Sequence, residues 1–154
     1  MKQGKSIVEL ATEIQRQAEA KVDYCVDTRE MALDPFTAEL SIGSEIKHPL
    51  TTVAHRQVGN HVGIPAPYYD TMLSQAPALL AGNVNHWWHG MNNVRRTVRT
   101  LDGNARAYLS DRYRRIDNDE IAEIVLPILL ESPDIKVLSS EITERRMYIT
   151  AVFP

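Results

Sequence analysis

The chain has 154 residues, of which 44% are hydrophobic and 24% are charged, as in an ordinary globular protein that buries a core. Its net charge of −3 and isoelectric point near 5.9 argue against a protein whose whole surface binds nucleic acid. The first 21 residues are too polar for a signal peptide, no apolar run could span a membrane, and a single cysteine excludes an internal disulfide. The composition therefore predicts one cytoplasmic domain over residues 1–154.

The N-terminal part of the chain alternates between helical and extended patterns. Apolar residues at helical spacing indicate an amphipathic helix, and shorter apolar or alternating runs indicate strands. In chain order, the predicted elements are a helix over residues 6–21, a strand over 22–26, one helical turn capped by Asp27 or Thr28, and a strand over 37–42.

Three helices are predicted in the middle of the chain, over residues 49–62, 66–74 and 76–91. Thr51 or Thr52 is expected to cap the first helix, and Gly63 supplies the left-handed residue that ends it. The first two helices superficially resemble a helix-turn-helix. The second has no arginine or lysine with which to contact bases and phosphates, so we expect it to pack and not to read DNA.

The C-terminal part begins with a hairpin, since residues 94–101 alternate, Asp102-Gly103 is a strong turn signal, and a second short strand follows. Further predicted elements are a helix over 119–131 that is capped by Asp117 or Asn118 and contains Pro127, and strands over 135–141 and 145–152. The fold class is therefore α+β, with helices packed on a mainly antiparallel sheet and a central β-hairpin near residues 94–109. The chain stops at an apolar strand, so we expect a fragment truncated at its C-terminus.

Seven of the twelve arginines lie in one stretch of 22 residues, Val94 to Arg115. Two aspartates lie among them, which leaves the stretch at +5 while the remaining 132 residues carry −8. Arginine pairs with phosphate through a planar fork and stacks on flat rings, and tyrosines interleave with the arginines here. The residues expected to contact nucleic acid are Arg95, Arg99, Arg106, Tyr108, Arg112, Tyr113, Arg114 and Arg115.

Strand alternation predicts that Arg95 and Arg99 share one face of the hairpin and that Arg96 lies on the other. Arginines on one face would form a basic strip, and the rings of Tyr108 or Tyr113 would stack on bases, as in single-stranded nucleic-acid binding. Two alternatives stay open. The arginines can pair with neighbouring carboxylates on a solvated sheet face, or they can bind another anion.

Other motifs carry less chemistry. His86 and His89 are spaced to chelate a metal from one helix, but two ligands do not make a site, so no metal or cofactor is expected. No phosphate-binding glycine loop, zinc motif or nucleophile arrangement is present, and no catalytic residue is assigned.

Several segments resemble the phage/plasmid-like proteins of domain-of-unknown-function family 932, over roughly residues 22–153. The most specific are GIPxxY, at residues 63–68, and RTLDG…RAxLSDRYRxIDN, at residues 99–118. Members of that family are usually longer and have no agreed activity. The resemblance implies a setting in phages, plasmids and bacteria, and no catalytic residue transfers from it.

The leading hypothesis is a non-enzymatic module of mobile-element DNA metabolism that binds single-stranded DNA through the arginine hairpin and the residues after it. A second hypothesis is a protein-interaction or host-inhibitor module that uses the same basic hairpin. A third is an enzyme that acts on a phosphorylated or nucleic substrate. A homo-oligomer is also compatible with the sequence, because an exposed strand edge can pair with a copy of itself.

Overall fold

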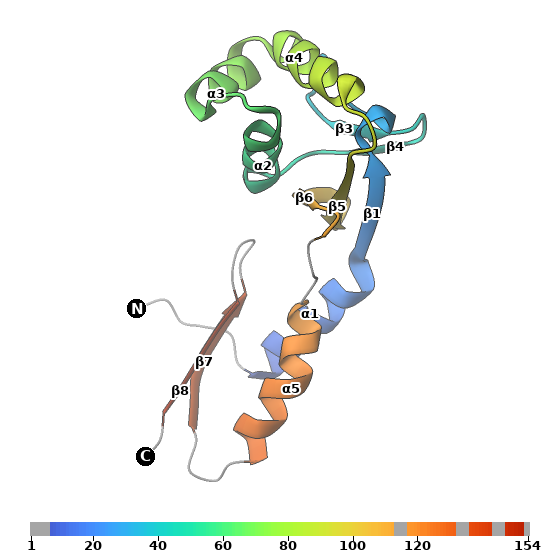
Figure 1. Cartoon of the computed structure of the whole chain (residues 1–154). Coiled ribbons are helices and arrows are strands. Elements are labelled where there is room, and N and C mark those ends of the chain that lie inside the picture. Colours follow the sequence, from blue (N-terminus) through green and yellow to red (C-terminus); the bar gives the residue numbers. More distant parts are fainter. Residues whose placement is uncertain (1–6, 113–116, 132–135, 143–146, 153–154) are drawn as a thin grey trace. The chain divides into compact units, whose positions relative to one another are not determined.

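A computed structural model describes residues 7–112, 117–131, 136–142 and 147–152. The chain divides into two compact units (Figure 1). The central unit is Lys21–Tyr113, and the terminal unit joins Met1–Ala20 to Arg114–Pro154. The expectation that the chain forms a single domain stays a prediction.

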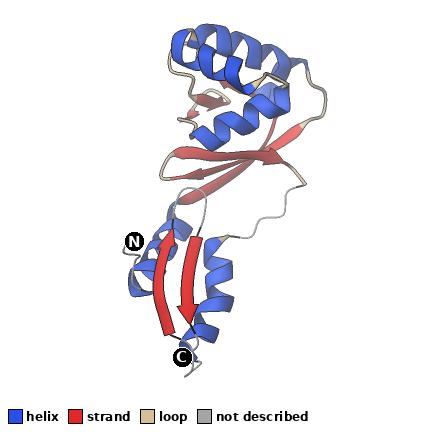
Figure 2. Cartoon of the chain, turned by 90° about the vertical axis from the view of Figure 1, so that its left-hand side faces the viewer, coloured by secondary structure: helices blue, strands red, loops and turns tan. Residues whose placement is uncertain are grey.

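Two small antiparallel sheets and three helices build the central unit. One sheet has the strand order β1-β5-β6 and the other has the order β2-β3-β4. Figure 2 distinguishes the strands, in red, from the helices, in blue. The elements in chain order are β1 (Lys21–Asp27), the 3₁₀ turn η1 (Thr28–Glu30), β2 (Met31–Leu33), β3 (Leu40–Ile42), β4 (Ile46–His48), α2 (Thr52–Val62), α3 (Ala66–Gln75), α4 (Pro77–Gly90), β5 (Arg95–Leu101) and β6 (Asn104–Ser110).

The β5–β6 hairpin turns at Asp102 and Gly103, whose φ angles of 52° and 79° are the left-handed values that a two-residue hairpin turn requires. Beyond the turn, Thr100 pairs with Ala105, but the next residue, Arg99, pairs with Ala107. Arg106 is therefore an extra residue in β6, that is, a β-bulge. The bulge places Tyr108 opposite Val98, on the face of the sheet that carries the buried core.

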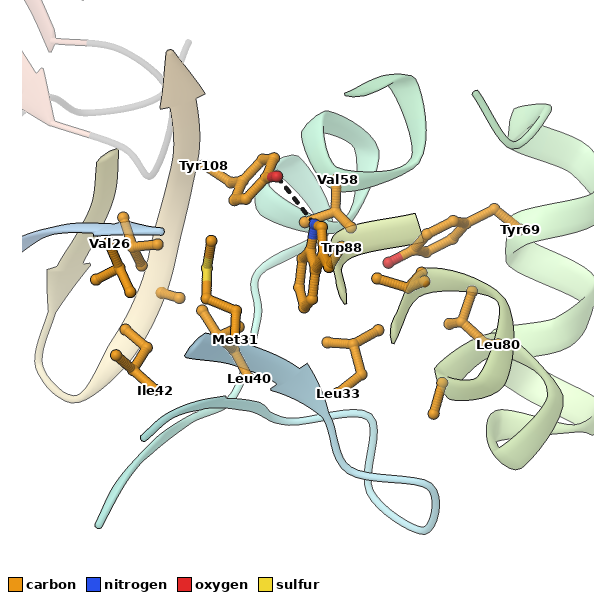
Figure 3. Packing of buried hydrophobic residues seen from close by; sticks show 14 of the residues in the cluster. Val26, Met31, Leu33, Leu40, Ile42, Val58, Tyr69, Leu80, Trp88 and Tyr108 are labelled. Atoms are coloured by element: carbon orange, nitrogen blue, oxygen red, sulfur yellow. Dashed lines mark hydrogen bonds between the residues drawn. The ribbon is translucent and has the colours of Figure 1, made fainter. Parts of the chain in front are cut away.

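Trp88 of α4 and Tyr108 of β6 lie at the centre of the core of the central unit (Figure 3). Both are almost completely buried, and the indole Nε1 of Trp88 donates a 3.0 Å hydrogen bond to the Tyr108 hydroxyl. The buried residues around them come from both sheets and all three helices, and include Val26, Met31, Leu33, Leu40, Val58, Tyr69, Leu80, Val84 and Val98.

The ends of α2 follow the sequence signals. Thr51 is its N-cap, and the Thr51 hydroxyl accepts a hydrogen bond from the backbone N–H of Ala54 at 3.2 Å. Gly63 ends the helix in the left-handed conformation, with φ of 79°. Asp27 likewise caps η1, and its side chain accepts from the Arg29 backbone N–H. These predicted caps are confirmed.

α4 lies along β2, the outer strand of the second sheet. The side-chain amide of Asn85 accepts a hydrogen bond from the backbone N–H of Leu33 at 2.7 Å and donates to its carbonyl at 3.1 Å. One turn further along the helix, Nε2 of His89 is 2.8 Å from the carbonyl oxygen of Met31. Helix side chains thus satisfy the backbone of this strand.

The terminal unit contains α1 (Ile7–Ala20), α5 (Asn118–Glu131), β7 (Lys136–Ile142) and β8 (Met147–Val152), with β7 and β8 paired antiparallel. Its core is small and is formed by Leu10 and Ile14 of α1 with Ala122 of α5, against which Leu126, Ile142, Met147 and Ile149 pack. Ile124 and Ile128 of α5 are 68% and 58% exposed.

The predicted α+β class is confirmed, and the strands are antiparallel as expected. Two details differ from the prediction. The strands form separate small sheets, and the three-residue strands β2 and β4 are additional to those expected. Within the described residues, no helix is long and apolar enough to cross a membrane.

Two glycines in helices give a matched test of this packing. A Cβ at Gly59 of α2 would lie 2.9 Å from a ring carbon of buried Tyr69, whereas a Cβ at Gly82 of α4 would have no atom within 4 Å. We expect Gly59→Ala to lower the free energy of unfolding by about 1–2 kcal/mol, because overpacking outweighs the gain in helix propensity. Gly82→Ala should raise it by up to about 1 kcal/mol. Urea unfolding of both variants measures this, and equal effects would contradict the close contact at Gly59.

Candidate functional site in the arginine hairpin

The structure separates the predicted nucleic-acid-binding residues into groups. Arg95 and Arg112 are exposed, and Arg106 is partly buried at the bulge. Arg99 and Tyr108 are buried. The remaining three predicted residues lie outside the described residues: Tyr113, Arg114 and Arg115.

Arg99 is part of the packing of the first sheet. It pairs directly with Asp23 across β1 and β5, and its Nε donates to the Asp23 carboxylate at 3.3 Å. The two side chains are only 8% and 10% exposed. Separating a buried ion pair leaves an uncompensated charge, which costs about 3–5 kcal/mol. Arg99, which the sequence predicts to contact phosphate, is thus buried against Asp23.

Tyr108 has no exposed ring face for a base. The residue is 1% exposed, because the bulge at Arg106 turns it toward the helices. Burial raises the pKa of its hydroxyl to about 12. The ring of Tyr108, which the sequence predicts to stack on bases, thus belongs to the core.

The Tyr108 hydroxyl joins two side chains from different helices. It accepts from Nε1 of Trp88, and it is 2.6 Å from Nδ1 of His61 at the end of α2. The hydroxyl has one hydrogen, and of these two partners only the histidine nitrogen can accept it. Nδ1 of His61 is therefore the acceptor and Nε2 carries the ring hydrogen. Burial lowers the pKa of His61, and the charge of Arg96 lowers it further.

Arg96 lies on the face that the sequence prediction did not select. Its guanidinium carbon is 4.6 Å from the centroid of the Tyr108 ring, which is a cation–π contact. Its Nε is buried and has no hydrogen-bond partner among the described residues. Arg96 is not among the residues predicted from the sequence, because strict alternation places it away from the expected basic strip. The signal available was its position two residues before Val98, on the apolar face of the strand.

Three arginines gather where β5 begins and β6 ends. Arg96 pairs with Ser110, Arg95 is next to Arg96, and the backbone N–H of Arg112 donates to the Ser110 hydroxyl at 3.2 Å. Arg95 donates to the carbonyl of Cys25 at 2.8 Å. We call Arg95, Arg96 and Arg112 the basic sheet end.

Carboxylates near the basic sheet end offset part of its charge. Asp27 lies opposite Arg95 in the sheet but is bonded to Arg29, whose side-chain hydrogen bond lowers the pKa of that carboxyl to about 2. Glu30 and Asp111 are exposed. With Asp27 neutralised by Arg29, three guanidiniums remain against these two carboxylates, so this end of the sheet is locally positive.

The histidines take part in the packing of the chain. Nδ1 of His55 is 2.7 Å from the hydroxyl of buried Tyr69, and Nδ1 of His48 is 2.7 Å from the carbonyl oxygen of Gly103. His86 contacts the ring of Trp87 edge-on. Among the described residues, no three histidine, cysteine or acidic side chains lie close enough together to hold a metal ion.

No protein-family model, curated protein or solved structure matches this chain.

A double-mutant cycle tests the buried ion pair. Arg99→Ala should lower the free energy of unfolding by about 3–5 kcal/mol, because it leaves the Asp23 carboxylate buried without this partner. In the Arg99→Ala background, Asp23→Ala should cost much less than it does alone, as contacting residues are coupled. Urea unfolding of the four chains gives the coupling. The exposed Arg95→Ala serves as control and should stay within about 0.5 kcal/mol of the parent. If the two single substitutions have additive effects on the free energy of unfolding, Arg99 and Asp23 do not form a coupled ion pair.

Stability should decrease as the solution becomes acidic. Burial lowers the pKa of His55 from 6.5 to about 4, and the pKa of His61 is also lowered. Above pH 6.5, His55 is neutral in both states and the free energy of unfolding keeps its full value. Below pH 6.5 the unfolded chain binds a proton that the folded chain does not, so the free energy of unfolding falls between pH 6.5 and pH 4. Urea midpoints between about pH 7.5 and pH 4.5 measure the effect.

The variant His55→Gln should flatten this pH dependence, and the exposed control His86→Gln should leave it unchanged. If the parent chain has the same midpoint at both ends of the range, the neutral buried state of His55 is wrong.

Proposed function

We propose that the chain binds single-stranded nucleic acid through the basic sheet end, without catalysing a reaction. The observation that carries the proposal is the gathering of Arg95, Arg96 and Arg112 at one end of the β5–β6 hairpin. Guanidinium forks pair bidentately with phosphate oxygens, and phosphate contacts supply most of the affinity of sequence-independent binding.

The arrangement favours a strand over a small anion. Arg95 begins β5 and Arg112 lies two residues after the end of β6, and two further arginines, Arg114 and Arg115, follow Tyr113 in the sequence. A flexible chain of phosphates can contact several such guanidiniums in succession. Arg106, at the bulge, is a further candidate for phosphate contact.

Under this proposal, some residues of the arginine stretch contact the nucleic acid and others hold the hairpin in the fold. Arg99 holds β5 to β1 through Asp23, and Tyr108 holds β6 to the helices. The stacking of bases is assigned to Tyr113, the remaining tyrosine of the arginine stretch. The setting that the family resemblance implies, in phages, plasmids and bacteria, accords with a module of mobile-element DNA metabolism.

Salt dependence tests the proposal directly. Labelled single-stranded and duplex DNA and RNA would be titrated by fluorescence polarisation at about 50 and 200 mM salt, where phosphate contacts show as a steep loss of affinity. Arg95→Ala combined with Arg112→Ala should reduce the slope of log K against log salt by about 1.4, since each phosphate contact to a single strand contributes about 0.7.

A charge-matched control separates this site from the general charge of the chain. Arg16 on α1 and Arg56 on α2 are exposed side chains that pair with Glu13 and Asp70. Replacing both by alanine removes the same charge and should leave the slope nearly unchanged. An equal change in both double variants would reject the basic sheet end as the site. Absence of binding at the lower salt would overturn the proposal in favour of an acidic protein partner.

A further inference from the structure

We propose that Arg96 and His61 form a preorganised seat for one phosphate group, here called the phosphate seat, which Tyr108 and Trp88 hold in place. As a contact for a nucleic-acid strand, the seat rests on the proposed function. As a site for a phosphate oxyanion, it stands on its own geometry. It differs from the exposed contacts of Arg95 and Arg112, because its donors are fixed by a buried network.

The Arg96 guanidinium lies over the face of a ring that is itself held by hydrogen bonds. The guanidinium carbon lies 4.6 Å from the Tyr108 ring centroid. The Tyr108 hydroxyl is hydrogen-bonded to Trp88 and His61. The backbone N–H of Tyr108 donates to the side-chain oxygen of Gln57 at 2.8 Å. A guanidinium held in this way loses little conformational freedom when it binds an anion, which is the advantage of preorganisation.

The hydrogen-bonding capacity of Arg96 is incomplete within the protein. Its Nε is buried and has no partner among the described residues, although buried donors in folded proteins nearly always have one. The Nε edge of a guanidinium offers two parallel N–H groups to one oxyanion. An oxyanion on this edge would accept a hydrogen bond from the buried Nε–H of Arg96, and the charge of the guanidinium would neutralise it.

His61 supplies the second donor. Because its Nδ1 accepts from the Tyr108 hydroxyl, its Nε2 carries a hydrogen. Arg96 and His61 contact the same tyrosine, Arg96 over the face of the Tyr108 ring and His61 at its hydroxyl. Among the described residues, the titratable or charged groups that interact with His61 are Tyr108 from β6 and Arg96 from β5. An oxyanion beside Arg96 would offset its charge and raise the pKa of the imidazole.

The experiment is an NMR titration of the His61 imidazole in the full chain, with and without inorganic phosphate at constant ionic strength. Phosphate should raise the pKa of His61 by about 1 and shift the Nε–H resonance of Arg96. The exposed His86 serves as the internal control and should not respond. If neither phosphate nor nucleic acid changes the pKa of His61 in the parent chain, the phosphate seat is overturned, regardless of the results with the variants.

Variants and ligands make the result specific. Arg96→Lys keeps the charge but removes the fork, so it should abolish the response to phosphate. Arg16→Ala, at an exposed arginine that pairs with Glu13, should preserve it. A response that survives in folded Arg96→Lys would overturn the assignment of Arg96. Single strands with and without a 5′-phosphate identify the source. A response to both indicates internal phosphodiesters, and a response to the phosphorylated strand alone indicates a terminal phosphate.

The same titrations separate the two proposals. If phosphate moves the His61 pKa but no strand binds at low salt, the seat stands and single-stranded binding fails. If a strand binds with a steep salt dependence but neither it nor phosphate moves the His61 pKa, the proposed function stands and the seat fails.

Discussion

The extra residue in β6 determines which way Tyr108 faces, and much of the central unit depends on that direction. Without the bulge at Arg106, the register set by the turn at Asp102 would place Tyr108 on the opposite face of the sheet. With the bulge, its hydroxyl reaches Trp88 of α4 and His61 of α2. One inserted residue therefore decides that the sheet and two helices share a hydrogen-bonded centre.

The same hydrogen-bonded centre also supports the proposed binding surface. The ring that packs against the core on one side carries the guanidinium of Arg96 on its face. The exposed arginines beside it are positioned by backbone contacts, as in the bond from Arg95 to the carbonyl of Cys25. The arginines of the stretch thus differ in burial. Arg99 pairs with Asp23 within the sheet, Arg96 packs on the Tyr108 ring, and Arg95 and Arg112 are exposed to solvent.

The parts of the fold that the sequence predicted are those governed by local chemistry. The cap at Thr51, the left-handed end at Gly63 and the turn at Asp102 each depend on a few neighbouring residues, and each is present. The features that it missed depend on residues far apart in the chain. Arg99 is buried because β1 pairs with β5 and brings Asp23 opposite it, and no local pattern contains that pairing.

The candidate site follows the same division. The concentration of arginines is visible in one stretch of the sequence, but the face on which Tyr108 lies depends on a bulge in β6 that simple alternation does not contain. Strict alternation favoured Arg99 and passed over Arg96. The partners of Arg96, namely Tyr108 and through it His61 and Trp88, come from three separate elements, so only the folded chain brings them together.

The contact of α4 with β2 has a consequence for how this chain can associate. The outer edge of a sheet normally offers unpaired N–H and carbonyl groups to any extended chain that approaches it. Here the amide of Asn85 makes with Leu33 the two hydrogen bonds that a neighbouring strand would make, and His89 lies within hydrogen-bonding distance of the carbonyl of Met31. A helix thus occupies the place of the next strand, and the β2-β3-β4 sheet cannot grow by strand addition at this edge, either with a partner or with a second copy of itself.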